Sequence, residues 1–390
     1  MAAIRATFQT RYSPPVVSRI AVARGADGAA VAGELADQLA GPGVRLVIAF
    51  ADARIDNIAA FARELQRRID APVIGCTANA VVGFAETTRP TSTAMALCGD
   101  WLRAGVGVAT ELSRSPIVRS RDAVRRAAGA LRLEPDALDP VRHVAFTLID
   151  GTSRHEDSFC IGSAAAMPQI KVVGGVASSD NDGHRDARVF AFGEPMADAG
   201  IVTVLETKRR WEAFTSQHVV PTELKVVVTA VGGDREIVEL DGKPAARRLR
   251  ELLGSIGIEL DAPRPTRFTF ARYVDGVPYV RIIRAIEGDA IHVATSVEPG
   301  HVMHVMRTGD LVGTTRADLA AVDKRIGGIS ALLAWSCMAR HWEAEVSGLA
   351  EPLARVYSER QVCGFRSFGE QSGMLLVNYT LAGLAFGAPL

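Results

Sequence analysis

The run VAFTLIDGTSRHEDSFCIGSAAAMPQIKVVGGVA, residues 144–177, decides how we expect this chain to fold. It opens on an apolar run at residues 144–149, continues through a polar turn and a helical segment at 155–167, and returns to an apolar run with Gly174 and Gly175. Short apolar runs bounded by turn signals are typical of strands. The stretch therefore predicts a strand, a turn, a helix and a second strand, and two later apolar runs predict a hairpin.

The same pattern occurs twice more in the chain, at residues 47–78 and at residues 331–367. Repeats of one supersecondary unit imply that the units pack together and share a core. We expect each second strand to end in glycine, as in GCTA at 75–78, because glycine permits positive φ or close backbone approach. These glycine corners are where we expect a binding site.

Composition and charge exclude several classes of protein. The 390 residues are 48% hydrophobic and 23% charged, as in ordinary globular proteins, and 44 basic residues balance 44 acidic ones. No net field then draws the chain to nucleic acid or to an anionic membrane, so we expect neither as a partner.

Targeting signals and disulfides are not expected either. Residues 1–24 lack the apolar core of a signal peptide, and the uncharged stretch 371–390 is too polar and glycine-rich to span a membrane. Five widely spaced cysteines do not form a disulfide framework, which favours a reduced, cytoplasmic protein.

Hairpin signals dominate after Val219, at Gly232-Gly233-Asp234 and at Asp275-Gly276, with a helix from Ala245 between them. Earlier in the chain we expect residues 94–97 to pair with 104–108, and residues 188–192 with 200–206. The predicted fold is mixed α/β (α+β), with two domains built from repeated strand–helix–strand–hairpin units and mixed sheets. The predicted boundaries are an N-terminal segment at 1–27, a first domain at 28–212 and a second at 213–390.

Six short motifs occur in an order that resembles the FIST family, with its N-terminal and C-terminal FIST domains side by side. They are GCTA (75–78), GGVA (174–177), LDGKPA (240–245), SCMAR (336–340), GFRSFGE (364–370) and NYT (378–380). The resemblance covers roughly residues 28–385. It departs from the family at Asn79-Ala80-Val81-Val82, where Ser or Thr with an acidic residue is usual.

The resemblance implies a sensory role. Proteins of this family are regarded as intracellular signal-transduction modules that bind small ligands, with amino acids proposed, and some are implicated in nitric oxide sensing through haem. It implies a signalling partner, such as a histidine kinase or a cyclic-di-nucleotide enzyme. We therefore expect a stand-alone sensory module that binds a small polar ligand.

Candidate ligand-binding residues lie at the strand ends. Asp150 could bind an amine or shape its turn, and Arg340 could bind a carboxylate or pair with Glu370. Glycine N–H groups could bind an anion. The full predicted set is Cys76, Thr77, Asp150, Gly174, Gly175, Cys337, Arg340, Gly364, Phe365, Glu370 and Asn378.

Two alternatives remain open at this point. A cysteine-dependent hydrolase or transferase would use Cys76 or Cys337, although no base is evident beside either in the sequence. A haem-based sensor would take an axial ligand from His301, His304 or His341, but a His-x-x-His pair alone is a weak signal. We predict neither a metal site nor catalytic residues.

Overall fold

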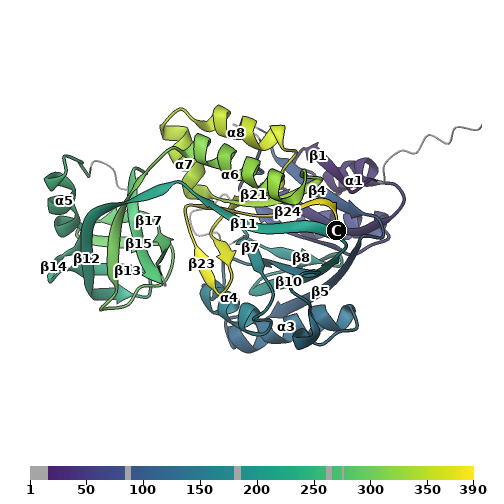
Figure 1. Ribbon diagram of the computed structural model, residues 1–390, viewed down its shortest axis with the longest axis horizontal. Helices are drawn as coiled ribbons and strands as arrows, with labels where there is room; N and C mark the ends of the chain where they lie inside the picture. The colour runs from purple at the N-terminus through teal and green to yellow at the C-terminus, as the bar shows by residue number, and fades with distance from the viewer. Residues whose placement is uncertain (1–15, 84–88, 180–185, 261–265, 275) are drawn as a thin grey trace, which may run out of the picture.

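The structure is a computed structural model that describes residues 16–83, 89–179, 186–260, 266–274 and 276–390. These residues have a mixed α/β fold, which confirms the predicted fold class. Three mixed sheets with helices outside them form a body, and a smaller β-rich lobe lies at one end of it (Figure 1). The start of the predicted N-terminal segment and Asp275 of the second predicted hairpin turn fall outside the described residues.

The first sheet has the order β1-β4-β2-β3-β8-β9, and helices α1 and α2 contact it. Asp27 caps α1 by accepting from the Ala30 N–H, and Asn57 caps α2 in the same way through the Ala60 N–H. The bounds are β1 (Ser18–Arg24), α1 (Gly28–Leu39), β2 (Val44–Asp52), α2 (Ile58–Arg68), β3 (Val73–Ala78), β4 (Thr91–Cys98), β8 (Val189–Ala191) and β9 (Glu194–Met196).

The second sheet has the order β23-β22-β7-β6-β10-β5, and α3 packs on its β5 and β10 strands. The bounds are β5 (Leu102–Thr110), α3 (Pro116–Ala130), a 3-10 turn (Pro135–Ala137), β6 (His143–Ile149), α4 (Glu156–Ala165), β7 (Val172–Val176), β10 (Ala199–Thr207), β22 (Glu370–Ser372) and β23 (Leu375–Val377).

The third sheet has the order β11-β24-β20-β21, and α6 packs against β11 and β24. Its elements are β11 (Arg209–Gln217), α6 (Leu311–Ile326), β20 (Ala331–Cys337), α7 (Met338–Val346), α8 (Ala350–Glu359), β21 (Cys363–Ser367) and β24 (Thr380–Pro389). Each sheet is thus built around one parallel pair, β2/β3, β6/β7 or β20/β21, and these pairs define the first, second and third units.

The units complete one another's sheets in a cycle. After β7, the hairpin β8-β9 pairs with β3 of the first unit, and after β21 the hairpin β22-β23 pairs with β7 of the second. After β3, the chain pairs with β21 of the third unit, where the Arg366 N–H donates to the Ala80 carbonyl at 2.8 Å and Val82 donates to Gly364 at 3.1 Å. The chain therefore covers an edge of each sheet with a segment of another unit.

Two predicted hairpins are wrong, because strands that follow each other in the chain join different sheets. Strand β4 pairs with β1 and β2, whereas β5 pairs with β10, so the two strands around Gly99 lie in different sheets. Likewise β8 joins the first sheet and β10 the second. Adjacent apolar runs predict strands but do not say which sheet each strand joins.

The inner faces of the three sheets meet in one apolar core. The Phe50 ring of the first sheet lies 4.8 Å from the Phe365 ring of the third, and Phe146 of the second lies 5.8 Å from Trp335 of the third. All four rings are fully buried, and burial of an aromatic side chain of this size stabilises a fold by roughly 1.5–3 kcal/mol. The shared core predicted from the repeats is present.

The repeated glycines lie within the second strands rather than at strand ends, which corrects the expectation. Gly75, Gly174 and Gly364 stand at the same register, beside Ala49, Thr147 and Ala334 of the first strands. A Cβ atom added at these glycines would lie 1.9, 2.4 and 2.0 Å from the neighbouring backbone oxygens. Close approach of the strand backbones, and not positive φ, therefore requires glycine here.

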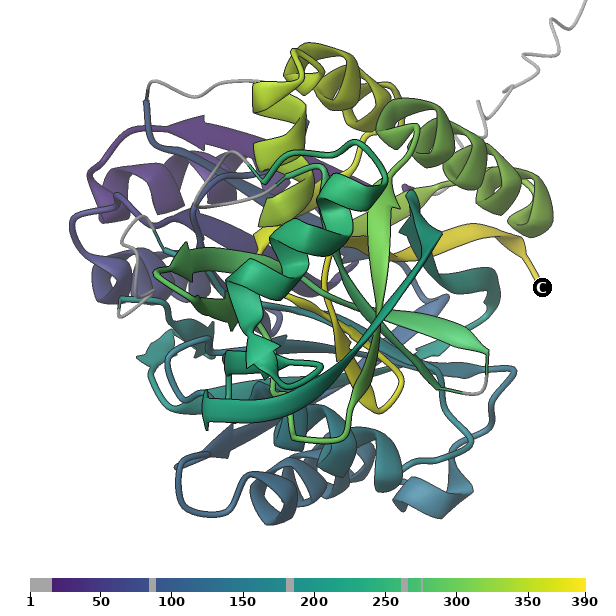
Figure 2. The same cartoon turned by 90° about the vertical axis from the view of Figure 1, so that its left-hand side faces the viewer.

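The β lobe, residues 219–308, is inserted between β11 and α6 and covers one end of the body (Figure 2). Its sheet has the order β16-β15-β19-β12-β13-β18-β17, with β14 beside β13. The predicted boundary at residues 212/213 stays a prediction; β11 spans it, and the β lobe begins at Val219. The bounds are β12 (Val219–Gly233), β13 (Glu236–Leu240), β14 (Lys243–Pro244), α5 (Ala245–Ser255), β15 (Phe268–Val274), β16 (Val277–Arg281), β17 (Ile283–Glu287), β18 (Ala290–Val293) and β19 (Val302–Thr308).

We predict that Gly364→Ala lowers the free energy of unfolding by about 3 kcal/mol, since the methyl group would overlap the Ala334 carbonyl of a strand paired on both sides. The matched control is Gly129→Ala in α3, where a Cβ meets nothing within 4 Å. There alanine should stabilise by about 0.5–1 kcal/mol. Urea unfolding of both variants measures this, and equal midpoints would contradict the close-approach explanation.

Candidate functional site

The first strands of the three units end at equivalent corners. By their register against the neighbouring strands, Asp52, Asp150 and Cys337 occupy the same position. All three side chains are buried, and a buried polar atom needs hydrogen-bond partners. The corners can therefore be compared directly, which shows where unused bonding capacity remains.

The first two corners are saturated. Asp52 accepts from the N–H groups of Arg54 and Thr91, at 3.0 and 2.8 Å, and the Arg54 guanidinium lies 2.8 Å from it. Asp150 accepts from the N–H of Thr152 at 2.8 Å, from its hydroxyl at 2.7 Å and from the Asp198 N–H. Each carboxylate thus joins the turn after its own strand to the start of a neighbouring strand, which is β4 for Asp52 and β10 for Asp150.

In the third unit a thiol occupies the same position. The backbone N–H groups of Ala339 and Tyr379 donate hydrogen bonds to the Cys337 sulfur. They correspond to the N–H groups of Thr152 and Asp198, which donate to Asp150. Burial nevertheless raises the pKa of the Cys337 thiol, and the nearby Glu370 raises it further. The thiol is therefore neutral, and this corner lacks the carboxylate that satisfies the other two.

Arg340, at the start of α7, is a fully buried cation. Its Nη2 donates to the Thr315 hydroxyl at 2.6 Å and its Nη1 lies 3.3 Å from Nδ1 of His218, while Nε has no partner among the described residues. The Nε2 atom of His218 lies 2.6 Å from the Glu343 carboxylate. Burial lowers the pKa of His218, which favours its neutral form. Neither Thr315 nor a neutral His218 carries a negative charge, so the direct contacts do not compensate the charge of the guanidinium.

Glu370 and Asn378 add unused polar atoms. The Ser367 hydroxyl donates to Oε1 of Glu370 at 2.5 Å, but Oε2 has no partner, and neither polar side-chain atom of Asn378 has one among the described residues. Both side chains are fully buried. Burial raises the pKa of Glu370 well above its usual 4.5, although the Ser367 hydroxyl, the Arg340 charge, the Thr380 N–H and the Cys337 thiol lower it.

The β lobe covers this cluster. Ala271, Val280 and Met306 of the lobe pack in one apolar cluster with Cys337 and Tyr379. The Tyr379 hydroxyl also donates to the Thr266 carbonyl at 2.6 Å. We call Cys337, Arg340, Glu370, Asn378 and Tyr379, with His218, the third-unit corner.

The FIST N domain matches residues 45–243 of the chain, and the FIST C domain matches residues 245–373. The chain belongs to the FIST family. FIST domains are generally considered sensory signalling domains. A comparison with curated protein sequences gives no match.

Similarity of this FIST protein to solved structures is distant. Cyanuric acid hydrolase from A. caulinodans aligns over 96% of this chain and 99% of its own, with a TM-score of 0.36 and 12% identity. PurLQS from Thermotoga maritima aligns over 97% of this chain and 74% of its own, with a TM-score of 0.21 and 11% identity. Similarity at this level says nothing about the activity of the FIST protein.

Four of the predicted site residues come together at the third-unit corner, namely Cys337, Arg340, Glu370 and Asn378. Asp150 lies at the second corner, where its own turn uses both carboxylate oxygens. No described ion pair joins Arg340 to Glu370.

The other predicted residues lie inside the sheets. Cys76 and Phe365 are in the central core, and the Thr77 hydroxyl accepts from the Arg188 N–H at 2.9 Å. Gly174, Gly175 and Gly364 lie in strands paired on both sides.

The histidines considered for haem are engaged with protein groups. His341 is buried with Nε2 3.1 Å from the Ser336 hydroxyl, and both ring nitrogens of His301 face partners, the Glu298 N–H and the Arg272 guanidinium. His304 lies against Tyr273, with the ring centroids 4.5 Å apart and the ring planes tilted by 47°. Both ring nitrogens of His301 and the Nε2 atom of His341 are thus already engaged by protein groups. In the described part of the chain, no cluster of His, Cys, Asp and Glu could hold a metal ion, and no helix has both the length and the apolar content to span a membrane.

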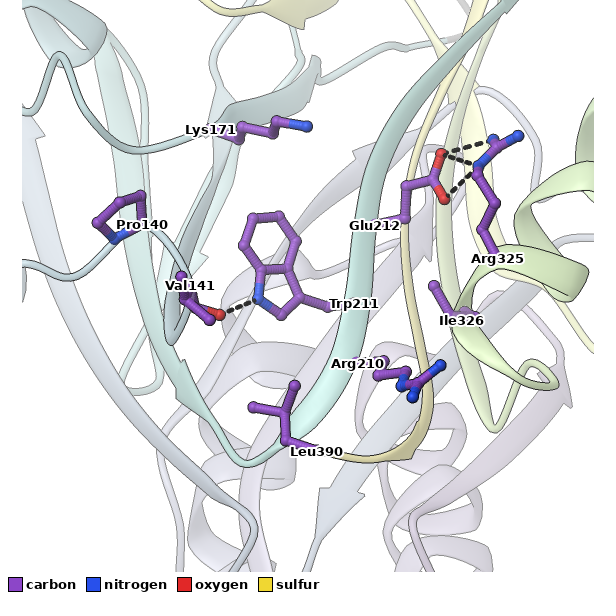
Figure 3. Close-up of a pocket in the computed structure, with 9 residues that line it drawn as sticks. All are labelled: Pro140, Val141, Lys171, Arg210, Trp211, Glu212, Arg325, Ile326 and Leu390. Atoms are coloured by element: carbon purple, nitrogen blue, oxygen red, sulfur yellow. Dashed lines mark hydrogen bonds and ion pairs between the residues drawn. The ribbon is translucent and has the colours of Figure 1, made fainter.

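A surface cleft of about 530 Å³ lies at the opposite end of the strands (Figure 3). The Trp211 indole donates to the Val141 carbonyl at 2.9 Å, and Arg325 forms an ion pair with Glu212 at 2.6 Å. Equivalent clefts occur where the other two units begin, and they likewise contain cations paired with acids. Lys171 and Arg210 also line the first cleft and form no described ion pair, but both are exposed, so water solvates their charges. The buried polar atoms of the third-unit corner lack such compensation, which makes that corner the candidate site.

Sequence reasoning missed His218, Glu343 and Tyr379. Tyr379 was part of the quoted NYT motif, and it has a positive φ of 58°, a conformation unfavourable for a bulky residue. Strain of this kind gathers at functional sites. His218 lies 122 residues before Arg340 in the sequence, so only the fold reveals that the two are neighbours.

The raised pKa of Glu370 predicts a pH-dependent stability. A carboxyl with a higher pKa in the folded protein than in the unfolded chain contributes fully below the unfolded pKa, and this contribution is lost as pH rises through the folded pKa. Glu370→Gln should therefore gain stability relative to wild type, by up to about 1.4 kcal/mol per pH unit, as pH rises above the ordinary carboxyl range toward the raised pKa of Glu370.

Urea unfolding across that range measures the gain. The control is Glu64→Gln, because Arg67 and Arg68 lower the pKa of Glu64 to about 2 and its contribution should be constant from about pH 6 upward. Parallel curves for wild type and Glu370→Gln would contradict a raised pKa of Glu370.

Proposed function

We propose that this FIST protein is a sensory module that binds a small polar ligand at the third-unit corner, beneath the β lobe. The observation that carries the proposal is the set of unpartnered polar atoms there: Arg340 Nε, Glu370 Oε2 and the amide of Asn378. A buried polar atom without a partner costs about 1–3 kcal/mol. A ligand that supplies these partners would recover that cost on binding.

The charges at the corner favour a ligand with an anionic group and a hydrogen-bonding or cationic group. Arg340 has no carboxylate in direct contact, and its planar guanidinium suits a ligand carboxylate. Burial raises the pKa of Glu370, and an ammonium group beside it would lower that pKa and favour the carboxylate. A zwitterionic amino acid combines both groups and is the ligand class we propose.

Binding would favour one arrangement of the β lobe on the body, and a separate partner would respond to that arrangement. The partner we propose is a cytoplasmic histidine kinase or cyclic-di-nucleotide enzyme. This step rests on the sensory character of FIST domains and on the position of the corner between two parts of the protein.

A cysteine-dependent enzyme is less well supported. Burial raises the pKa of both Cys76 and Cys337, whereas nucleophilic cysteines need a lowered pKa. His218 interacts with Glu343 and Arg340. No described interaction makes it a base for either thiol.

Asn378→Leu tests the proposal, because it removes two unpartnered polar atoms while keeping the same branched arrangement of side-chain heavy atoms. We expect the variant to be at least as stable as wild type but to lose ligand affinity by about tenfold or more. Binding is measured by thermal-shift screening of amino acids and related carboxylates, followed by calorimetry on the best ligand.

Two controls make this result specific. Asp52→Asn, at the saturated first corner, should bind like wild type. Gln371→Leu should be destabilised by a few kcal/mol, since the Gln371 side chain makes hydrogen bonds to Thr147, Cys160, Ser163 and Gly373. If Asn378→Leu binds the wild-type ligand equally well, or loses stability as Gln371→Leu does, the assigned site is wrong.

A further inference from the structure

The β lobe is joined to the body by a narrow neck. The chain enters the lobe at His218 and leaves it at Gly309, and these two residues lie against each other. A Cβ on Gly309 would come within 2.5 Å of the His218 carbonyl oxygen. Beyond this point β12 and β19 run antiparallel, with Val219 paired to Thr308, so the covalent connection between lobe and body is one pair of adjacent chain passages. So narrow a connection is suited to act as a hinge.

A buried ion pair holds the lobe to the body away from the neck. Arg235 of the lobe lies 2.8 Å from Glu156 at the start of α4, and Arg235 also donates to the Arg154 carbonyl at 3.4 Å. Yet Glu156 Oε1 has no hydrogen-bond partner in the described part of the chain, and the Nε of Arg235 has only the Asp234 carboxylate, 3.8 Å away. Burial also raises the pKa of Glu156. An incompletely satisfied buried pair gains little over its desolvation cost, so this contact can open.

The His218–Gly309 neck and the Arg235–Glu156 ion pair both fix the position of the lobe over the third-unit corner. The third-unit corner is buried because the lobe packs over Cys337 and Tyr379, and a ligand cannot reach Glu370 or Asn378 while the lobe stays closed. We propose that the β lobe is a gate that swings about the His218–Gly309 neck. The Arg235–Glu156 ion pair is its charged latch, beside the hydrogen bonds from Arg281 to the Leu376 carbonyl and from Tyr379 to the Thr266 carbonyl. This inference rests on the proposed function, because it describes access to the same site.

His218 connects the neck to the ligand site. A guanidinium can only donate, so the Nδ1 atom of His218 accepts from Arg340, and Nε2 carries the proton that is donated to Glu343. A ligand carboxylate that draws Arg340 toward itself would weaken this contact at the neck. Ligand binding and lobe position are coupled by that exchange.

The thiol of Cys337 reports gate opening without any ligand. It lies beneath the lobe, whereas Cys363 is buried in the core of the same unit, away from the lobe. Alkylation by N-ethylmaleimide, followed by peptide mass mapping, measures both rates in one sample. We expect Cys337 to react faster than Cys363 in the wild-type protein.

Glu156→Gln tests the latch. It removes the charge that holds Arg235 and should increase the alkylation rate of Cys337 on the order of tenfold, with no change at Cys363. Glu212→Gln is the matched control, since it breaks an ion pair within the body and should leave both rates unchanged. Gly309→Ala should also raise the Cys337 rate, through the clash at the neck.

Equal rates for Cys337 and Cys363 in every variant would overturn the gate, because exposure would then require unfolding of the whole body. A rise at both thiols in Glu156→Gln would overturn it in the same way. Since no ligand is used, these outcomes are independent of the binding test of Asn378→Leu.

Discussion

The structure depends on close contact between the two parallel strands of each unit, with the strand edges covered in a cycle by the other units. Glycine at one register allows the backbones to approach, as at Gly364 beside Ala334. The cycle closes where residues 80–82 pair with β21. Unpaired strand edges are exposed to wrong pairing, and sharing them fixes the three units in one body.

This arrangement also explains how one unit can carry a site while the others keep the fold. Asp52 and Asp150 use their carboxylates to hold two corners. The third corner has Cys337 instead, and nearby Glu370 and Asn378 keep unpartnered polar atoms. Buried polar atoms of this kind reduce stability, and function is a physical reason for a protein to retain them.

Much of this could be predicted from the sequence, because strand, turn and helix signals are local. The three repeated units, the hairpin at residues 232–234 and the helix from Ala245 are confirmed. Sheet membership was not predictable, since apolar runs such as those around Gly99 carry no record of their partners. The four site residues Cys337, Arg340, Glu370 and Asn378 were proposed from their positions at strand ends, but His218 and the cover by the β lobe depend on contacts distant in sequence.

The central claim is that the third-unit corner holds a polar ligand. A high-resolution crystal structure of the protein, soaked with the best ligand from the binding screen, tests it most directly. The account predicts density for a ligand whose polar atoms lie within hydrogen-bond distance of Arg340 Nε, Glu370 Oε2 and the Asn378 amide. An empty corner in which these atoms bond to the protein, with the ligand bound elsewhere, would contradict it.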